Sequence, residues 1–195
     1  PGSDPVRVAQ SREDGALRLL SVGAVVPRKG FDVLVAALAT LTDLPWRLTI
    51  AGDRSRDRDA AAQLDADIAR HQLGKRIAAL GAVSPRRLAA LYAEADVFVL
   101  ASHFEGYGMA YAEAIAHGLP VIGTNAGAIP DTLPPDASVL VAAGDVPALA
   151  QALRRVIGEA DLRRGLAAAA RIAAPKLPTW RHSAEIFACA LETLA

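Results

Sequence analysis

The sequence predicts an α/β domain in three layers, in which helices cover both faces of a six-stranded parallel sheet. Short apolar runs alternate with longer segments of helical periodicity along most of the chain. The runs are short and mostly apolar, which is typical of strands buried on both faces of a parallel sheet. Alanine is abundant and only 5% of the residues are aromatic, which favours helices packed closely on a sheet. A chain of 195 residues has room for one such domain.

The elements are expected in alternating order, as the right-handed crossovers of a parallel sheet require. The expected strands span residues 17–22, 47–51, 77–80, 97–101, 120–123 and 138–141. The helices between them are expected at 31–41, 57–72, 85–93 and 107–117, with one helical turn near Ala128. After Asp145, which is well placed to cap a helix, only helices are expected, at 146–157, 161–173 and 179–194.

The chain is expected to divide into three parts. Residues 1–16 are polar, aperiodic and contain two prolines, which is typical of a linker that leads into a domain. Residues 17–174 form the predicted α/β domain. Residues 175–195 form a last helix that Pro175 and Pro178 separate from the domain, and we expect it to pack on another part of the protein.

Composition excludes several classes of function. The chain has 21 basic and 21 acidic residues, so no overall field attracts nucleic acid or an anionic membrane. Cys189 is the single cysteine, which excludes an internal disulfide and fits a reducing, cytoplasmic setting. No apolar run approaches the ~20 residues that cross a bilayer, and no signal peptide begins the chain. Membrane contact, at the inner face of the membrane, is expected only through another domain.

The loop after the first expected strand carries two cations where a helix begins. It runs from Gly23 to Gly30 and contains Arg28 and Lys29. In open parallel sheets, ligands bind beyond the carboxyl ends of the strands. An arginine and a lysine at that edge suit a diphosphate, which arginine binds through paired hydrogen bonds and lysine as a compact charge. Taken alone, the pair is better explained as ordinary surface cations, because short motifs are weakly specific.

The loop after the fourth expected strand is rich in glycine and leads into a helix. Gly106 and Gly108 let the backbone approach a ligand closely. The free N–H groups of residues 106–109 would point at a phosphate, and the helix dipole favours the same charge.

Two glutamates bracket this amide-rich turn. Glu105 faces the space beyond the predicted pyrophosphate, and Glu113 lies about two turns into the helix, near enough to accept both hydroxyls of a ribose. For either residue alone, complementing the helix dipole or facing solvent is an equally good explanation. Both together, at the end of a buried strand, favour a ligand that has phosphate between two hydroxyl-bearing ends.

Two other chemistries fit the sequence less well. A nicotinamide dehydrogenase would need G-x-G-x-x-G after the first strand, where Gly23-Ala24-Val25 stands. Two D-x-D sequences, residues 57–59 and 65–67, match a metal-binding form but fall in an expected helix. No metal is therefore expected, and Arg28 and Lys29 would supply the positive charge.

The glutamate pair and its neighbours resemble a known family. The resemblance rests on Glu105, Gly106, Gly108, Glu113, Ala114, residues 118–122 and the turn at 125–127. Together they resemble the C-terminal domain of retaining glycosyltransferases of the GT-B family 4. The resemblance extends from Leu19 to about Asp145 and implies a Rossmann-like domain that binds a nucleoside diphosphate sugar, with UDP, GDP or ADP as carrier. Residues 1–4 resemble the family's interdomain linker, and the helix with Trp180 resembles its closing helix.

The resemblance also implies a role for each site residue. Glu105 would contact the transferred sugar, and Arg28 and Lys29 would stabilise the departing diphosphate. Further contacts to the donor are implied for Gly23, Asp53, Gly81, Val83, Gly106, Tyr107, Gly108, Met109 and Glu113. Within that set the amides of residues 106–109 would hold sugar hydroxyls and pyrophosphate, residues 81–83 the base, and Glu113 the ribose. No further cofactor is expected.

One departure and two alternatives accompany the resemblance. Many relatives have an arginine directly after the first-strand glycine, where this chain has Ala24, so Arg28 compensates or one phosphate contact is lost. The acceptor would bind to an N-terminal domain, so this chain alone is expected to bind donor weakly and transfer nothing. A sugar-nucleotide epimerase of the same build and a module that binds nucleotide-sugar without catalysis share the same donor site, and fold alone does not separate them.

Overall fold

The computed structural model describes residues 15–194, which form a six-stranded sheet in the order β3-β2-β1-β4-β5-β6. Every pair of neighbouring strands is parallel. The strands are β1 Leu17–Val22, β2 Trp46–Ala51, β3 Ile77–Ala79, β4 Val97–Val99, β5 Val121–Thr124 and β6 Ser138–Val141. The predicted α/β class and the predicted number of strands are confirmed.

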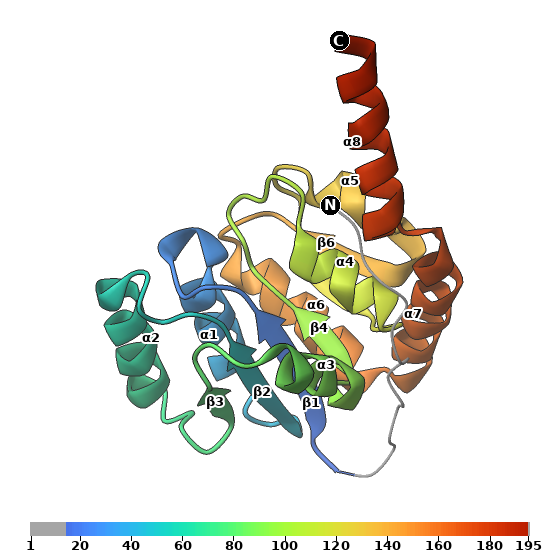
Figure 1. Ribbon diagram of the computed structural model, residues 1–195. Coiled ribbons are helices and arrows are strands. Elements are labelled where there is room, and N and C mark those ends of the chain that lie inside the picture. The colour runs from blue at the N-terminus through green and yellow to red at the C-terminus, as the bar shows by residue number, and fades with distance from the viewer. Residues whose placement is uncertain (1–14, 195) are drawn as a thin grey trace.

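Helices cover both faces of the sheet (Figure 1). The α-helices are α1 Phe31–Ala39, α2 Arg58–Arg70, α3 Pro85–Glu94, α4 Met109–Ala116, α5 Ile129–Thr132, α6 Val146–Gly158, α7 Ala160–Ala173 and α8 Trp180–Leu194. Short 3₁₀ segments are η1 Pro27–Lys29, η2 Pro135–Ala137 and η3 Ala174–Lys176. Helix α1 packs against α2 and α6, and α4 packs against α7. Helix α8 extends away from the body of the domain (Figure 1).

The central strands lie in the core and are pinned to each other. Val97, Phe98 and Val99 of β4 are fully buried, as the continuous apolar run predicts. At the amino end of the sheet, Arg18 donates to both carboxylate oxygens of the buried Asp96, at 2.8 and 3.1 Å. This bidentate pair fixes β1 beside β4.

The predicted boundaries differ from the observed ones by at most a few residues. The fourth helix was expected from Tyr107 and begins at Met109, because Gly108 takes a left-handed conformation with φ 85° and serves as the N-cap. The fourth strand ends at Val99 instead of Ala101, although the N–H of Leu100 still donates to the carbonyl of Ile122 at 3.1 Å. Residues 1–14 of the predicted linker lie outside the described residues, and the predicted division of the chain stays a prediction.

Among the described residues, no helix combines the length and the apolar composition that spanning a bilayer requires.

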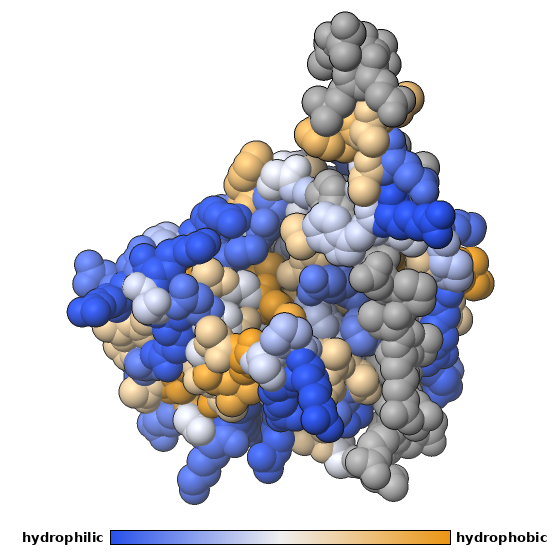
Figure 2. Space-filling model, in the orientation of Figure 1, coloured by the Kyte–Doolittle hydropathy of each residue, from blue (hydrophilic) through white to orange (hydrophobic). Residues whose placement is uncertain are grey.

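On the face drawn in Figure 2, polar side chains border an apolar area in the middle, over the region where β1 and β4 lie in Figure 1.

Gly30 joins η1 to α1 at a point where the loop after β1 lies close to Ala101, just beyond the end of β4. Its φ is 62°, which L side chains rarely adopt, and a Cβ there would lie 2.0 Å from the carbonyl oxygen of Ala101. Only glycine therefore allows this close approach.

We expect Gly30→Ala to lower the free energy of unfolding by about 2–4 kcal/mol, because both the backbone strain and the clash must be relieved. Urea denaturation measures the change. The matched control is Gly165→Ala in α7, where nothing lies within 4 Å of an added Cβ and alanine should stabilise the helix by up to about 1 kcal/mol. Equal effects of the two substitutions would show that Gly30 is not a packing constraint.

Candidate functional site

The loops after β1 and β4 meet beyond the carboxyl ends of these strands. The N–H of His103 donates to the carbonyl of Arg28 at 2.8 Å, and the Arg28 guanidinium donates to the carbonyl of Phe104 at 3.1 Å. The two cations predicted on one loop and the glutamate predicted on the other are thereby brought together.

Glu105 lies at the centre of this contact and is 6% exposed. Its Oε1 accepts from the Lys29 ammonium at 2.5 Å and from the Ser102 hydroxyl at 2.7 Å. Its Oε2 accepts from the Arg28 guanidinium at 3.1 Å. Lys29 is also buried, whereas the Arg28 side chain is 52% exposed. The carboxylate is therefore held by three donors, one of which also faces solvent.

These contacts determine the charge of Glu105. Burial alone would raise the pKa of this carboxyl, but the hydrogen bonds from Lys29 and Ser102, the Lys29 charge and the bond from Arg28 outweigh it and lower the pKa. Glu105 is thus a carboxylate at neutral pH, with no proton to donate.

A row of backbone amides follows Glu105. Within residues 15–194 we find no hydrogen-bond acceptor for the N–H groups of Gly106, Tyr107, Gly108 and Met109. A Cβ at Gly106 would meet nothing within 4 Å, so the protein itself leaves the space above this turn open. Unpaired amides at a helix N-terminus, with the dipole in the same sense, form an anion-binding arrangement.

The turn that carries these amides is anchored from the next strand. The carbonyl of Glu105 accepts from the N–H of Ala128 at 2.9 Å, and the Thr124 hydroxyl donates to the carbonyl of Ser102 at 2.5 Å. A Cβ at Gly127 would lie 2.4 Å from the Glu105 carbonyl oxygen, which explains the glycine in the turn at 125–127. The loop is thus held in one conformation before any ligand arrives.

Glu113 lies on α4 and is partly buried. Its Oε2 accepts from the hydroxyl of Tyr92 at 2.9 Å, and no described residue donates to its other oxygen. Burial, followed by the charge and hydrogen bond of Glu113, raises the pKa of Tyr92 well above its usual value, so the phenol keeps its proton.

Two predicted residues near the end of β1 and β2 serve the packing of the loops. A Cβ at Gly23 would come within 3.0 Å of Lys29 Cε, so Gly23 makes room for the lysine stem. Asp53 lies at the same edge of the sheet, but its Oδ1 accepts from the N–H and the hydroxyl of Ser55 at 2.8 and 2.7 Å. These bonds lower its pKa. In this structure the Asp53 carboxylate stabilises the turn formed by residues 53–55.

The third loop at this edge contains Gly81 and Val83. Gly81 has φ 74°, its carbonyl accepts from the N–H of Gly52 at 2.9 Å, and a Cβ on it would meet nothing within 4 Å. Val83 is partly buried. Both residues follow β3 at the carboxyl edge of the sheet; Gly81 lies beside open space, and Val83 packs against the hydrophobic core.

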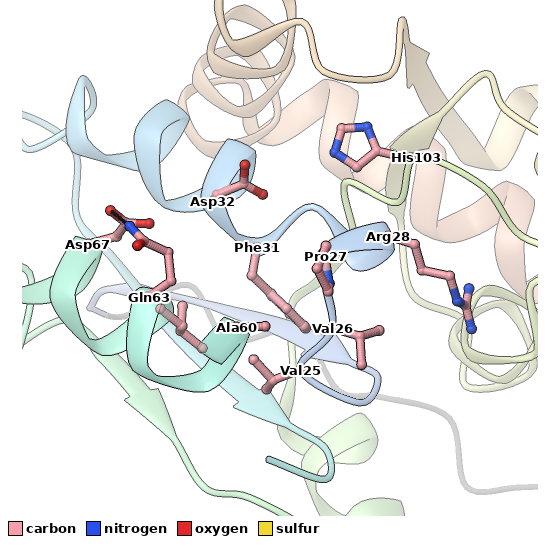
Figure 3. Close-up of a pocket in the computed structure, with 11 residues that line it drawn as sticks. Val25, Val26, Pro27, Arg28, Phe31, Asp32, Ala60, Gln63, Asp67 and His103 are labelled. Carbon is pink, nitrogen blue, oxygen red and sulfur yellow. Dashed lines mark hydrogen bonds between the residues drawn. The ribbon is translucent and has the colours of Figure 1, made fainter. Parts of the chain in front are cut away.

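A pocket of about 330 Å³ lies between η1, α1 and α2 (Figure 3). Val25 and Phe31 contribute apolar surface, and Gln63 and Asp67 lie on the α2 side, opposite Arg28 and His103. Neither Glu105 nor Glu113 lines it. Arg28 is thus shared between this pocket and the carboxylate cluster.

Three of the four carboxylates in the two D-x-D sequences have structural partners. Asp57 caps α2 by accepting from the N–H of Ala60, Asp65 pairs with Arg54, and Asp67 accepts from Gln63 and Arg70. Within the described part of the chain, no group of three or more His, Cys, Asp or Glu side chains is arranged to hold a metal ion.

Sequence reasoning missed two side chains that touch the predicted site. Ser102 could have been suspected, because it directly precedes the glutamate loop. Tyr92 gave no signal, because its contact with Glu113 joins two separate helices, α3 and α4, across 21 residues of sequence.

Comparison with known proteins gives a consistent result. The family model described as Glycosyl transferases group 1 matches residues 4–173. D-inositol 3-phosphate glycosyltransferase of Xylanimonas cellulosilytica is 38% identical over 158 residues, which are 80% of this chain and 37% of that protein.

Solved structures share the fold. Sucrose-phosphate synthase from Thermosynechococcus elongatus superposes with a TM-score of 0.87 at 26% identity, covering 99% of this chain and 51% of that one. HepE of Anabaena, solved in complex with UDP and glucose, gives 0.83 at 22% identity, covering 91% and 48%. This chain spans about half the length of these two structures, and 37% of the inositol phosphate enzyme. The chain belongs to the group 1 glycosyltransferases, with the Rossmann-like fold of a GT-B C-terminal domain.

Proposed function

We propose that this chain binds the nucleoside diphosphate sugar donor of a retaining glycosyltransferase. The observation that carries the proposal is the row of four backbone amides, at residues 106–109, that has no acceptor within residues 15–194. These amides begin α4 and directly follow a carboxylate that is bonded to two cations. An elongated ligand with phosphate in its middle suits this order of groups.

The roles follow the order of groups along the crevice. The amides of residues 106–109 bind the pyrophosphate and sugar hydroxyls, and Arg28 turns its exposed guanidinium to the diphosphate. Lys29 lends its charge while it stays bonded to Glu105. Glu113 accepts the ribose hydroxyls, and the base lies over residues 81–83. In this proposal Arg28, close to Ala24 in the same loop, supplies the phosphate contact that many relatives make with an arginine at position 24.

Glu105 positions the sugar in this proposal and does not attack it. A carboxylate bonded to Lys29, Arg28 and Ser102 is a weak nucleophile, because these donors already stabilise its charge. When the bond to the sugar breaks, negative charge grows on the diphosphate, and preformed amides and cations stabilise that charge without reorganising. In this proposal the cations and amides supply the positive charge at the diphosphate, in place of a metal ion.

The whole protein's activity depends on a second domain in this proposal. The chain covers 37% of the inositol phosphate enzyme and 51% of the sucrose-phosphate synthase chain. A preceding N-terminal domain would bind the acceptor and close the crevice, so this chain alone binds donor and transfers no sugar. Any membrane contact would belong to that domain. An epimerase or a binding module would use the same donor groups, but membership of the transferase family favours transfer.

Titration calorimetry with UDP, GDP and ADP tests the donor site. We expect one of them to bind with a Kd of about 1 mM or below, and Glu113→Ala to weaken that binding about tenfold, because charge-assisted bonds to the ribose are lost. The control is Glu94→Ala, which removes an exposed carboxylate from the C-terminal end of α3 and should leave affinity unchanged. Failure of all three nucleotides to bind at millimolar concentration would overturn the donor site.

Arg28→Ala tests the diphosphate contact. We expect binding of the preferred nucleoside diphosphate to weaken about tenfold, since a paired charge contact is removed, and binding of the matching monophosphate to weaken less. Arg171→Ala, an exposed arginine on α7, is the control. If Arg28→Ala weakens both nucleotides equally, the side chain does not read the second phosphate.

Acid titration tests whether Glu105 is ionised in the cluster. Because folding lowers its pKa, its contribution to stability is complete above the unfolded pKa of about 4.3 and is lost as pH falls through the lower folded value. Glu105→Gln should therefore be less stable than the unaltered chain at pH 7, and the gap should narrow below about pH 4. Urea denaturation at several pH values measures it. A gap that stays constant with pH would show that the ion pairs contribute nothing.

A further inference from the structure

The hydroxyl of Tyr92 contacts Glu113 from outside the predicted crevice. It lies 2.9 Å from Glu113 Oε2 and 3.2 Å from the carbonyl oxygen of Ala110. A phenol has one proton to donate, and the carboxylate is both the closer and the stronger acceptor. The bond joins α3 to α4, two helices that follow different loops at the carboxyl edge of the sheet.

The ring of Tyr92 is fixed in place by its neighbours. The residue is 2% exposed, and its ring stacks on His117 with centroids 4.9 Å apart. The ring of Phe98, in β4, also stacks with it, and these two ring centroids are 6.0 Å apart. Close packing of this kind strongly restricts the conformations of a side chain. The hydroxyl is therefore a fixed donor, and it holds one oxygen of Glu113 in a single position.

We propose that Tyr92 is a positioning residue for the contact between Glu113 and the ribose hydroxyls. In this role it sets how well the chain distinguishes nucleotides that carry both ribose hydroxyls from nucleotides that lack them. The inference rests on the proposed function, because it assumes that Glu113 binds ribose. A flexible glutamate loses side-chain entropy when it binds two hydroxyls, and a glutamate already held by Tyr92 loses less. Tyr92 itself touches no ligand.

The test compares ribonucleotides with their 2′,3′-dideoxy forms. UDP, GDP and ADP are titrated into the unaltered chain, and the one that binds is compared with its dideoxy counterpart. Tyr92→Phe keeps the stacked ring and removes the hydroxyl. We expect it to weaken the ribonucleotide about three- to tenfold and to leave the dideoxy form unchanged. In the Glu113→Ala background, Tyr92→Phe should have no further effect on either.

The matched control is Tyr111→Phe. This second buried tyrosine donates to the carbonyl of Leu100 at 2.7 Å and is not bonded to Glu113 among the described residues. Its loss should affect the ribonucleotide and the dideoxy form equally. Thermal melting of each variant shows whether the fold is kept.

The outcomes separate the two proposals. If none of the three nucleotides binds the unaltered chain, the proposed function fails and the inference fails with it. If a nucleotide binds but Tyr92→Phe weakens the ribonucleotide and the dideoxy form equally, or weakens neither, the donor site stands and the positioning role is overturned.

Discussion

The parallel pairing of β1 with β4 is the constraint on which the site depends. In the order β3-β2-β1-β4-β5-β6 the chain continues to opposite sides of the sheet after these two strands, which is the position at which open parallel sheets bind ligands. Arg18 and Asp96 fix the pair at one end of the sheet. At the other end Lys29 and Glu105, 76 residues apart, close the contact. A different strand beside β1 would separate the cations from the glutamate.

The sequence was sufficient for the fold because its signals were local. Short, mostly apolar runs predicted all six strands. Asp57, Ser84 and Asp145 are helix caps that accept from the N–H three residues later. The error at the start of α4 has a definite cause. Gly108 takes a left-handed conformation with φ 85°, which ends the preceding turn and makes Met109 the first residue of the helix, and a Cβ at Gly108 would lie 3.0 Å from the Tyr111 ring.

The site was predicted as a set of residues but not as an arrangement. The positions of Arg28, Lys29, Glu105 and Glu113 followed from where strands end, because those ends meet at one edge. The partners of the glutamates did not. That Oε1 of Glu105 is shared by Lys29 and Ser102, and that Glu113 is bonded to Tyr92, depends on side-chain packing between separate loops and helices. No spacing in a single sequence encodes such contacts.

The Lys29–Glu105–Arg28 cluster also bears on how an anion reaches the site. One carboxylate offsets one of two cations, and the chain as a whole has 21 charges of each sign. The remaining charge is screened beyond about 8 Å in physiological salt. Long-range steering therefore contributes little to the capture of an anion. Competing anions would then differ mainly in their dissociation rates, which depend on the fixed amides and side chains of the proposed site.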